Sequence, residues 1–201
     1  MKRIGFLAYG VFAYSAFLVT VLYAIGFIGG FGVPTRLDGA ATMPFWSALA
    51  TDVALLALFA VQHSAMARPA FKRWWMRVVP EAIERSTYVL ASSLALLLMF
   101  ALWQPMGGDI WRVEDSAGRV TLYALYAFGW LLVFSTTFMI NHCDLFGLRQ
   151  VWLHFRGKPY THLRFVTPGP YRLVRHPLYV GWLFAFWATP TMTLAHLVFA
   201  I

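Results

Sequence analysis

Four long stretches with few or no charged residues constrain this chain more than any other feature of its sequence. They occupy residues 4–33, 45–67, 86–106 and 120–140. Each reaches the roughly 20 residues that a helix needs to cross a hydrocarbon core about 30 Å thick. Only 12% of all residues are charged and 60% are hydrophobic, whereas soluble domains carry roughly 25% charged residues. The sequence therefore predicts an all-α, polytopic integral-membrane helical bundle with four clear spans.

A fifth apolar stretch, residues 178–201, is interrupted by Thr189-Pro190-Thr191. Proline lacks a backbone N–H and clashes with the preceding helical turn, so we expect either one kinked fifth span or the start of a helical hairpin. Since no hydrophilic linker divides the chain, residues 1–201 are predicted to form a single membrane domain. The sequence stops at Ile201 without a polar flank, and we expect it to be truncated at the C-terminus.

Basic residues are concentrated in alternate connecting segments. Most of the 16 Lys and Arg residues lie at the N-terminus, in residues 68–85 and in residues 141–175. The positive-inside rule assigns such segments to the cytosolic side, and the chain is predicted to lie in the cell's inner membrane with its N-terminus in the cytosol. The net charge of +8 is spread over three segments, which argues against nucleic-acid binding. Cys143 is the only cysteine, so an intramolecular disulfide is impossible.

Ionisable groups inside spans are costly and are candidates for function. In the second span Asp52 and His63 are 11 residues apart, which is three helical turns, so they share a helix face. Asp52 is interpreted either as a satisfied contact between helices or as a functional group. We expect a further set of side chains to be able to converge at the cytosolic end: His63, His142, Asp144, Arg175 and His176. No HxxxH or HxH spacing is present to fix two ligands on one face, so no metal site is predicted.

Residues 169–182, GPYRLVRHPLYVGW, place polar groups directly before the last apolar stretch. Pro177 suits the first turn of a helix, where its missing N–H has no intrahelical partner. The start of that helix would offer free N–H groups to an anionic group, and Arg175 could bind a carboxylate through two parallel hydrogen bonds. Tyr179 lies three residues after His176 and should face the same side. The alternative is a basic collar whose side chains extend toward the membrane surface.

The run RHPLY followed by Gly181, with PGPYR ahead of it, resembles the signature of integral-membrane methyltransferases related to isoprenylcysteine carboxyl methyltransferase and phospholipid N-methyltransferases. Residues 141–193 are more similar still to a bacterial branch, the methanethiol S-methyltransferases. This resemblance implies an enzyme with S-adenosylmethionine as methyl donor and a cytosolic catalytic segment at about 141–182. In that family a later segment carries a Glu-Glu pair and a tyrosine-rich end. Neither is present here, in keeping with the expected truncation.

The resemblance also implies roles for individual residues. The expected cofactor-binding residues are Arg175, His176, Leu178 and Tyr179, with Trp182 near the sulfonium. The expected acceptor is a small thiol, methanethiol, which methylation would convert to dimethyl sulfide. The candidates for deprotonating it are His63, Asp144, Tyr160 and His142, the last of which is preferred because an imidazole titrates near neutral pH.

Two other classes of protein stay open at this point. A membrane methyltransferase acting on a prenylcysteine carboxylate or a phospholipid amine would use the same cofactor residues. A non-enzymatic haem-binding or transport protein would use His63, His142 and His176 as ligands or relays. The expected partners are the lipid bilayer and a small thiol, without nucleic acid, and the sequence indicates no protein partner.

Overall fold

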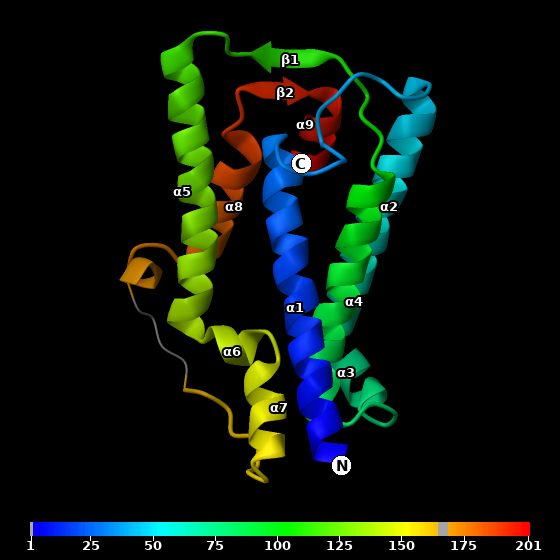
Figure 1. Cartoon of the computed structure of the whole chain (residues 1–201), viewed down its shortest axis with the longest axis vertical. Helices are drawn as coiled ribbons and strands as arrows, with labels where there is room; N and C mark the ends of the chain where they lie inside the picture. The colour runs from blue at the N-terminus through cyan, green and yellow to red at the C-terminus, as the bar shows by residue number, and fades with distance from the viewer. Residues whose placement is uncertain (1, 165–168) are drawn as a thin grey trace.

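The computed structural model describes residues 2–164 and 169–201, so Pro168 of the signature lies outside the described residues. The chain forms a helical bundle with one small sheet (Figure 1). Its elements are α1 (Lys2–Gly29), α2 (Phe45–Ala67), α3 (Pro69–Trp75), α4 (Glu81–Leu102), β1 (Asp109–Arg112), α5 (Ser116–Ile140), α6 (His142–Leu145), α7 (Leu148–Phe155), the 3-10 helix η1 (Gly169–Arg172), α8 (Pro177–Trp187), β2 (Thr191–Thr193) and α9 (Leu194–Ala200).

Four helices, α1, α2, α4 and α5, are long and apolar enough to cross a membrane, which confirms the four expected spans. Their bounds differ from the apolar runs by a few residues at the ends. The helix α4 begins at Glu81, directly after Pro80, because two acidic residues in its first turn are compatible with the positive end of a helix. The helix α1 ends at Gly29 because the chain turns back and the Phe31 N–H donates to the Gly26 carbonyl. Charged residues at a helix end thus extend the helix beyond its apolar run.

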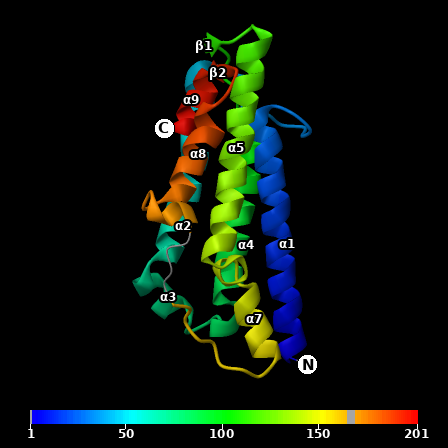
Figure 2. The ribbon, with the colours of Figure 1, turned by 90° about the vertical axis from the view of Figure 1, so that its left-hand side faces the viewer.

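The fifth apolar stretch forms a reversal, so its reading as one kinked span is wrong and the hairpin alternative holds. The helix α8 has 11 residues, which rise about 16 Å, roughly half of a hydrocarbon core. After it, β2 pairs antiparallel with β1, with Trp111 opposite Met192 and Arg112 opposite Thr191. The short helix α9 then turns back toward the bundle (Figures 1 and 2).

An ion pair and its hydrogen bonds connect this reversal, formed by β2 and α9, to the segment that follows α1. The imidazole of His196, which is fully buried, faces the Asp38 carboxylate through Nδ1 at 2.8 Å. Its Nε2 faces the Phe186 carbonyl at 2.8 Å, and the Thr193 hydroxyl donates to the second Asp38 oxygen at 2.6 Å. Because three polar groups satisfy one another here, the hairpin can be buried at this end without an unpaired charge.

The hydrophobic core lies in the half of the bundle nearest the sheet. Its largest buried side chains include Phe27, Leu37, Met99 and Phe100. The middle of α5 joins the same core through Tyr126 and Trp130, and α8 joins it through Ala185. All four long helices therefore contribute side chains to this core.

The helices α5 and α8 pack closely because each places a glycine at the crossing. A Cβ added to Gly181 would lie 2.8 Å from Val133 Cγ2 and 2.9 Å from the Gly129 carbonyl oxygen. No larger residue fits this position without moving a helix. The glycine of the RHPLYVG run therefore has a packing role.

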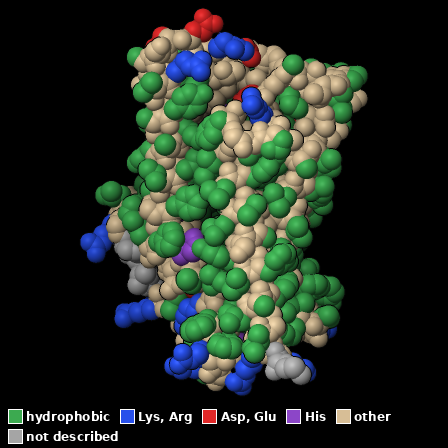
Figure 3. Space-filling view, in the orientation of Figure 1, with side chains coloured by type: hydrophobic (Ala, Val, Ile, Leu, Met, Phe, Trp, Pro, Cys, Tyr) green, Lys and Arg blue, Asp and Glu red, His purple; other side chains and the backbone are tan. Residues whose placement is uncertain are grey.

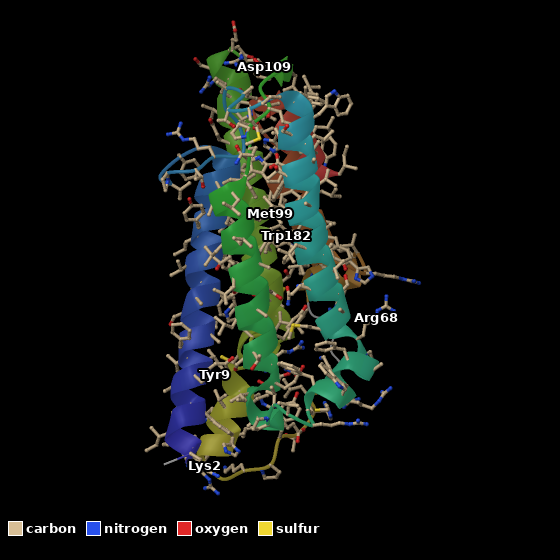
Figure 4. The ribbon with its side chains drawn as sticks, turned by 90° about the vertical axis from the view of Figure 1, so that its right-hand side faces the viewer. Lys2, Tyr9, Arg68, Met99, Asp109 and Trp182 are labelled. Carbon is tan, nitrogen blue, oxygen red and sulfur yellow. The ribbon has the colours of Figure 1, made fainter. Side chains whose placement is uncertain are left out.

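Charged side chains lie at the two ends of the bundle. Lys and Arg side chains gather at the end that carries α3 and α7, while at the end that carries β1 both basic and acidic side chains are visible (Figure 3). Lys2 and Arg68 lie in the half opposite Asp109 (Figure 4). Between the ends, large apolar side chains such as Phe12, Leu131 and Phe138 are exposed, as expected of a surface that contacts lipid. The chain is an integral membrane protein.

Candidate active site

A cavity of about 1020 Å³ with many charged side chains in its lining lies at the basic end, where the apolar core does not extend. Its walls come from α3, the first turns of α4, the end of α5, α6, α7, the segment 158–164 and η1. The polar and charged side chains that line it are Lys72, Glu81, Glu84, Arg85, Asn141, Asp144, Gln150, His154, Lys158, Tyr160, His162, Arg164 and Tyr171. A cavity with both signs of charge can bind a zwitterionic ligand.

Asp144 is positioned by a sharp break between α5 and α6. Asn141 has a φ of 145°, a conformation that costs a non-glycine residue about 1–3 kcal/mol. Its side-chain oxygen accepts a hydrogen bond from the Asp144 N–H at 3.0 Å and so caps α6. The cap fixes the position of the Asp144 carboxylate at the cavity wall.

Both oxygens of the Asp144 carboxylate accept hydrogen bonds. Arg149 Nη1 donates to Oδ1 at 2.9 Å, and the Tyr160 hydroxyl donates to Oδ2 at 3.2 Å. Burial, together with the neighbouring Asp144 charge, raises the pKa of Tyr160 above its usual value. Tyr160 therefore stays protonated at neutral pH and acts here as a hydrogen-bond donor.

The link between α6 and α7 packs directly on α4. Gly147 has a φ of +89°, and a Cβ added there would lie 2.8 Å from the Ser86 backbone nitrogen. Only glycine combines this left-handed conformation with so close an approach. This contact sets the distance between α4 and the Asp144 side of the cavity.

His142, the preferred base in the sequence analysis, does not line the cavity in the described part of the chain. It is 5% exposed and stacks on Phe138 with a ring separation of 4.1 Å. The Thr137 hydroxyl donates to the Phe134 carbonyl, so it must accept from His142 Nδ1 at 2.9 Å. His142 Nε2 then accepts from the Tyr14 hydroxyl at 2.8 Å. Burial lowers the pKa of His142, and the ring is a neutral bridge between α6 and α1.

His63 also lies away from the cavity lining. It hydrogen-bonds Tyr88 at 2.9 Å and Ser92 at 3.3 Å on α4. Asp52, three turns away, accepts from the Gln104 N–H at 2.9 Å. Both residues face α4 and its continuation, which confirms the shared helix face. The possible convergence of His63 with His142 and Asp144 does not occur in the described cavity.

The RHP stretch begins α8 as expected. Pro177 is the first residue of the helix and His176 precedes it. The His176 and Tyr179 rings are 5.3 Å apart and so lie on the same side, while Arg175 is exposed. Trp182 packs against the Trp130 ring at 5.2 Å. The stretch adjoins the cavity through Tyr171 of η1, which lines it.

The sequence did not indicate the cavity-lining residues Gln150, His154, His162 and Tyr171, or Arg149, which contacts the lining residue Asp144. Tyr171 lies within the GPYRLVRHPLYVGW run and Arg149 follows Asp144 by five residues, so closeness along the chain is the signal that could have indicated both. His154 and His162 carried no spacing signal. Among residues 2–164 and 169–201, no three His, Cys, Asp or Glu side chains are grouped so that they could hold a metal ion.

The fold and the cavity together define a class: a polytopic membrane protein with a polar site at the basic end of its helical bundle. The chain is 54% identical to methanethiol S-methyltransferase of Crocosphaera subtropica, covering 100% of this chain and 78% of the relative. It is 54% identical to methanethiol S-methyltransferase of Mycobacterium tuberculosis, covering 100% of this chain and 82% of the relative. The chain belongs to the methanethiol S-methyltransferase family, which confirms the resemblance found in the sequence.

A more distant relative is nurim of Mus musculus, 37% identical over 164 residues, which are 77% of this chain and 62% of the relative. No family model matches the chain. No solved structure matches it.

Proposed function

We propose that this protein transfers a methyl group from S-adenosylmethionine to methanethiol and so forms dimethyl sulfide at the cytosolic face of the inner membrane. The observation that carries the proposal is the identity of about half of all residues, over the whole chain, with relatives named for this reaction. The cavity at the basic end supports it, because positively charged ends of membrane bundles face the cytosol, where a soluble methyl donor is available.

The residues of the cavity fit such a donor. Its volume of about 1020 Å³ is at the upper end of the roughly 300–1,000 Å³ of small-molecule sites. The donor has an α-carboxylate, an α-ammonium and a sulfonium, for which Lys72, Arg85, Glu81 and Glu84 offer opposite charges. Gln150 Oε1 is buried without a hydrogen-bond partner among the described residues and can accept from an N–H or O–H group of the donor.

From the family signature we further propose that the donor contacts Arg175, His176, Leu178, Tyr179 and Trp182 at the start of α8. Arg175 and the helix N-terminus suit an anionic group, and Tyr179 suits the sulfonium through its aromatic face. Tyr171, four residues before Arg175, links this stretch to the cavity. These five residues are the proposed second part of the donor site.

Methyl transfer requires a thiolate and an in-line approach. The bound donor supplies an electrophilic methyl group on a positively charged sulfur. The thiolate sulfur forms a bond to that methyl carbon while the sulfonium C–S bond breaks, so dimethyl sulfide and S-adenosylhomocysteine leave and one proton is released. Positioning the two reactants about 3–3.5 Å apart is the larger part of such catalysis.

The remaining task is removal of the thiol proton. For an alkyl thiol with a pKa near ~10, ionisation at pH 7 costs about 4 kcal/mol. Positive groups in the cavity lower this cost, and His162, which lines the cavity beside the Tyr160 ring, is our choice for the proton acceptor. Asp144 and Tyr160 form the polar wall next to it, and His142 and His63 support the helices.

The experiment is headspace chromatography of the purified protein with methanethiol and S-adenosylmethionine carrying a deuterated methyl group. Deuterated dimethyl sulfide is the expected product. Methylation of a prenylcysteine or a phospholipid amine, with no dimethyl sulfide, would transfer the assignment to the lipid-modifying branch. A visible haem band and no methylation of any acceptor would contradict enzymatic activity altogether.

The donor site has a separate test. Arg175→Ala should weaken binding of S-adenosylhomocysteine, measured by calorimetry, by about 1.5–3 kcal/mol, or roughly ten- to a hundred-fold, the usual loss of a charge-assisted contact. Arg156→Ala is the matched control, because Arg156 is exposed and does not line the cavity. Equal binding by both folded variants would remove Arg175 from the donor site.

A further inference from the structure

Arg149 joins two parts of the cavity wall that are distant from each other along the chain. It is the second residue of α7, and its side chain is 20% exposed. One guanidinium nitrogen, Nη1, donates to Asp144 Oδ1 at 2.9 Å and to the Thr161 carbonyl at 2.8 Å. The other, Nη2, donates to the Thr161 hydroxyl at 3.0 Å. One planar group thus holds α6, α7 and the segment that follows them.

The Tyr160 side chain completes this arrangement. Its ring lies under the guanidinium, with the Arg149 Cζ 5.3 Å from the ring centre, and its hydroxyl donates to the other Asp144 oxygen. Arg149, Asp144 and Tyr160 therefore form a closed ring of contacts. Removing the guanidinium removes four contacts at once, whereas removing the Tyr160 hydroxyl removes one.

The segment 158–164 depends on these contacts for its position. It contributes Lys158, Tyr160, His162, Leu163 and Arg164 to the cavity lining, yet it contains no helix or strand. Within the described residues, no backbone N–H of 160–164 donates to another backbone group. A segment whose backbone N–H groups make no backbone hydrogen bonds is normally mobile. Side-chain contacts therefore hold this wall of the cavity in position.

We propose that Arg149 is a positioning residue that fixes the 158–164 wall over the cavity and thereby forms the donor-binding surface. The inference rests on the proposed function only for the identity of the ligand. Lysine cannot replace arginine in this role, because the guanidinium fork donates in fixed directions to three acceptors, whereas an ammonium is a compact point charge.

The first experiment needs no ligand. Cleavage by chymotrypsin after Tyr160 should become faster in Arg149→Lys, with the melting temperature close to that of the wild type, because a protease needs a segment that can move away from the protein surface. Arg156→Lys is the matched control directly after the same helix, because Arg156 is exposed and its guanidinium lies over the Trp152 ring, away from the 158–164 wall. An unchanged cleavage rate in folded Arg149→Lys would overturn the proposal. Thr161→Val, which removes only the hydroxyl contact, should give an intermediate increase, and it provides the test if Arg149→Lys does not fold.

The second experiment measures ligand binding and turnover. Arg149→Lys should bind S-adenosylhomocysteine about ten-fold more weakly, because the 158–164 wall is no longer held in its binding position and part of the binding free energy is spent on ordering it. KM for S-adenosylmethionine should rise by a similar factor while kcat changes less, since the chemistry does not pass through Arg149. Wild-type affinity in Arg149→Lys would contradict the donor-surface role. Failure of the wild type to bind S-adenosylhomocysteine would instead contradict the proposed function, and the cleavage result would still test the positioning role.

Discussion

Gly181 of α8 faces Gly129 of α5 so closely that each glycine's missing Cβ would lie within 3 Å of the other's carbonyl oxygen. Since these contacts are with backbone atoms, no rotation of a side chain can relieve them. The start of α8 and the whole RHP stretch are positioned by this crossing.

We therefore expect Gly181→Ala to destabilise the protein by about 1–3 kcal/mol, the usual cost of overpacking a tight interface. Thermal unfolding in detergent measures the effect. Gly5→Ala on α1 is the control, because a Cβ there meets nothing within 4 Å and alanine favours helix. A Gly181→Ala variant as stable as Gly5→Ala would show that α8 can move away from α5 at no cost.

Replacing His142 and replacing His162 by alanine should lower the activity with different dependence on pH. Because burial lowers the pKa of His142 and both ring nitrogens are engaged, His142 is neutral at and above neutral pH. We expect His142→Ala to lower kcat/KM by the same factor from about pH 7 to pH 9. The loss in His162→Ala should shrink as pH rises, because more of the thiol ionises unaided. Rate profiles of both variants test this, and a shrinking loss in His142→Ala would restore it as the base.

Asp38 should be far more important for stability than Asp109. Asp38→Ala leaves the buried His196 imidazole and Thr193 hydroxyl without their acceptor, at about 1–3 kcal/mol for each buried group. Asp109→Ala breaks an exposed pair with Arg112, which is worth about 0–1 kcal/mol. Thermal unfolding of the two variants compares their stabilities. A similar loss of stability in both would show that the network of Asp38, Thr193 and His196 contributes little to the stability of the fold.

Cys143 gives a direct test of orientation, because it is the only cysteine and is exposed. The proposed cytosolic face predicts that a membrane-impermeant maleimide labels it in inside-out vesicles and leaves it unlabelled in intact cells. Permeabilised cells supply the control for reactivity. Strong labelling of intact cells would place the cavity on the opposite side.

The fold was largely predictable because membrane-spanning helices can be recognised in a sequence from the length and hydropathy of their apolar runs alone. The reversal after α8 was harder to predict, since Pro190 is compatible with either a kink or a turn. The turn is formed because β2 pairs with β1, with Trp111 opposite Met192. A contact between residues so far apart along the chain produces no recognisable pattern in the local sequence.

The candidate site was predictable only in part. Pro177 at a helix start and the shared side of His176 and Tyr179 follow from helix geometry and are confirmed. His142 was expected in the cavity because it lies at the same level as Asp144. Two residues apart on one helical turn, however, they face different directions, and the residues on α1 that enclose His142 could not be known from the sequence.

The buried face of α5 has a mechanical consequence. The buried residues of this helix run from Tyr126 to Thr137, whereas residues 116–125 at the sheet end are mostly exposed. Only three residues, about 4.5 Å of helix, separate Thr137 from the end of α5 at Ile140. Rotating so short a lever by about 5° displaces its end by about 0.4 Å, so the cavity wall at Asn141 keeps its position while the exposed first turns of α5 can move with the membrane surface.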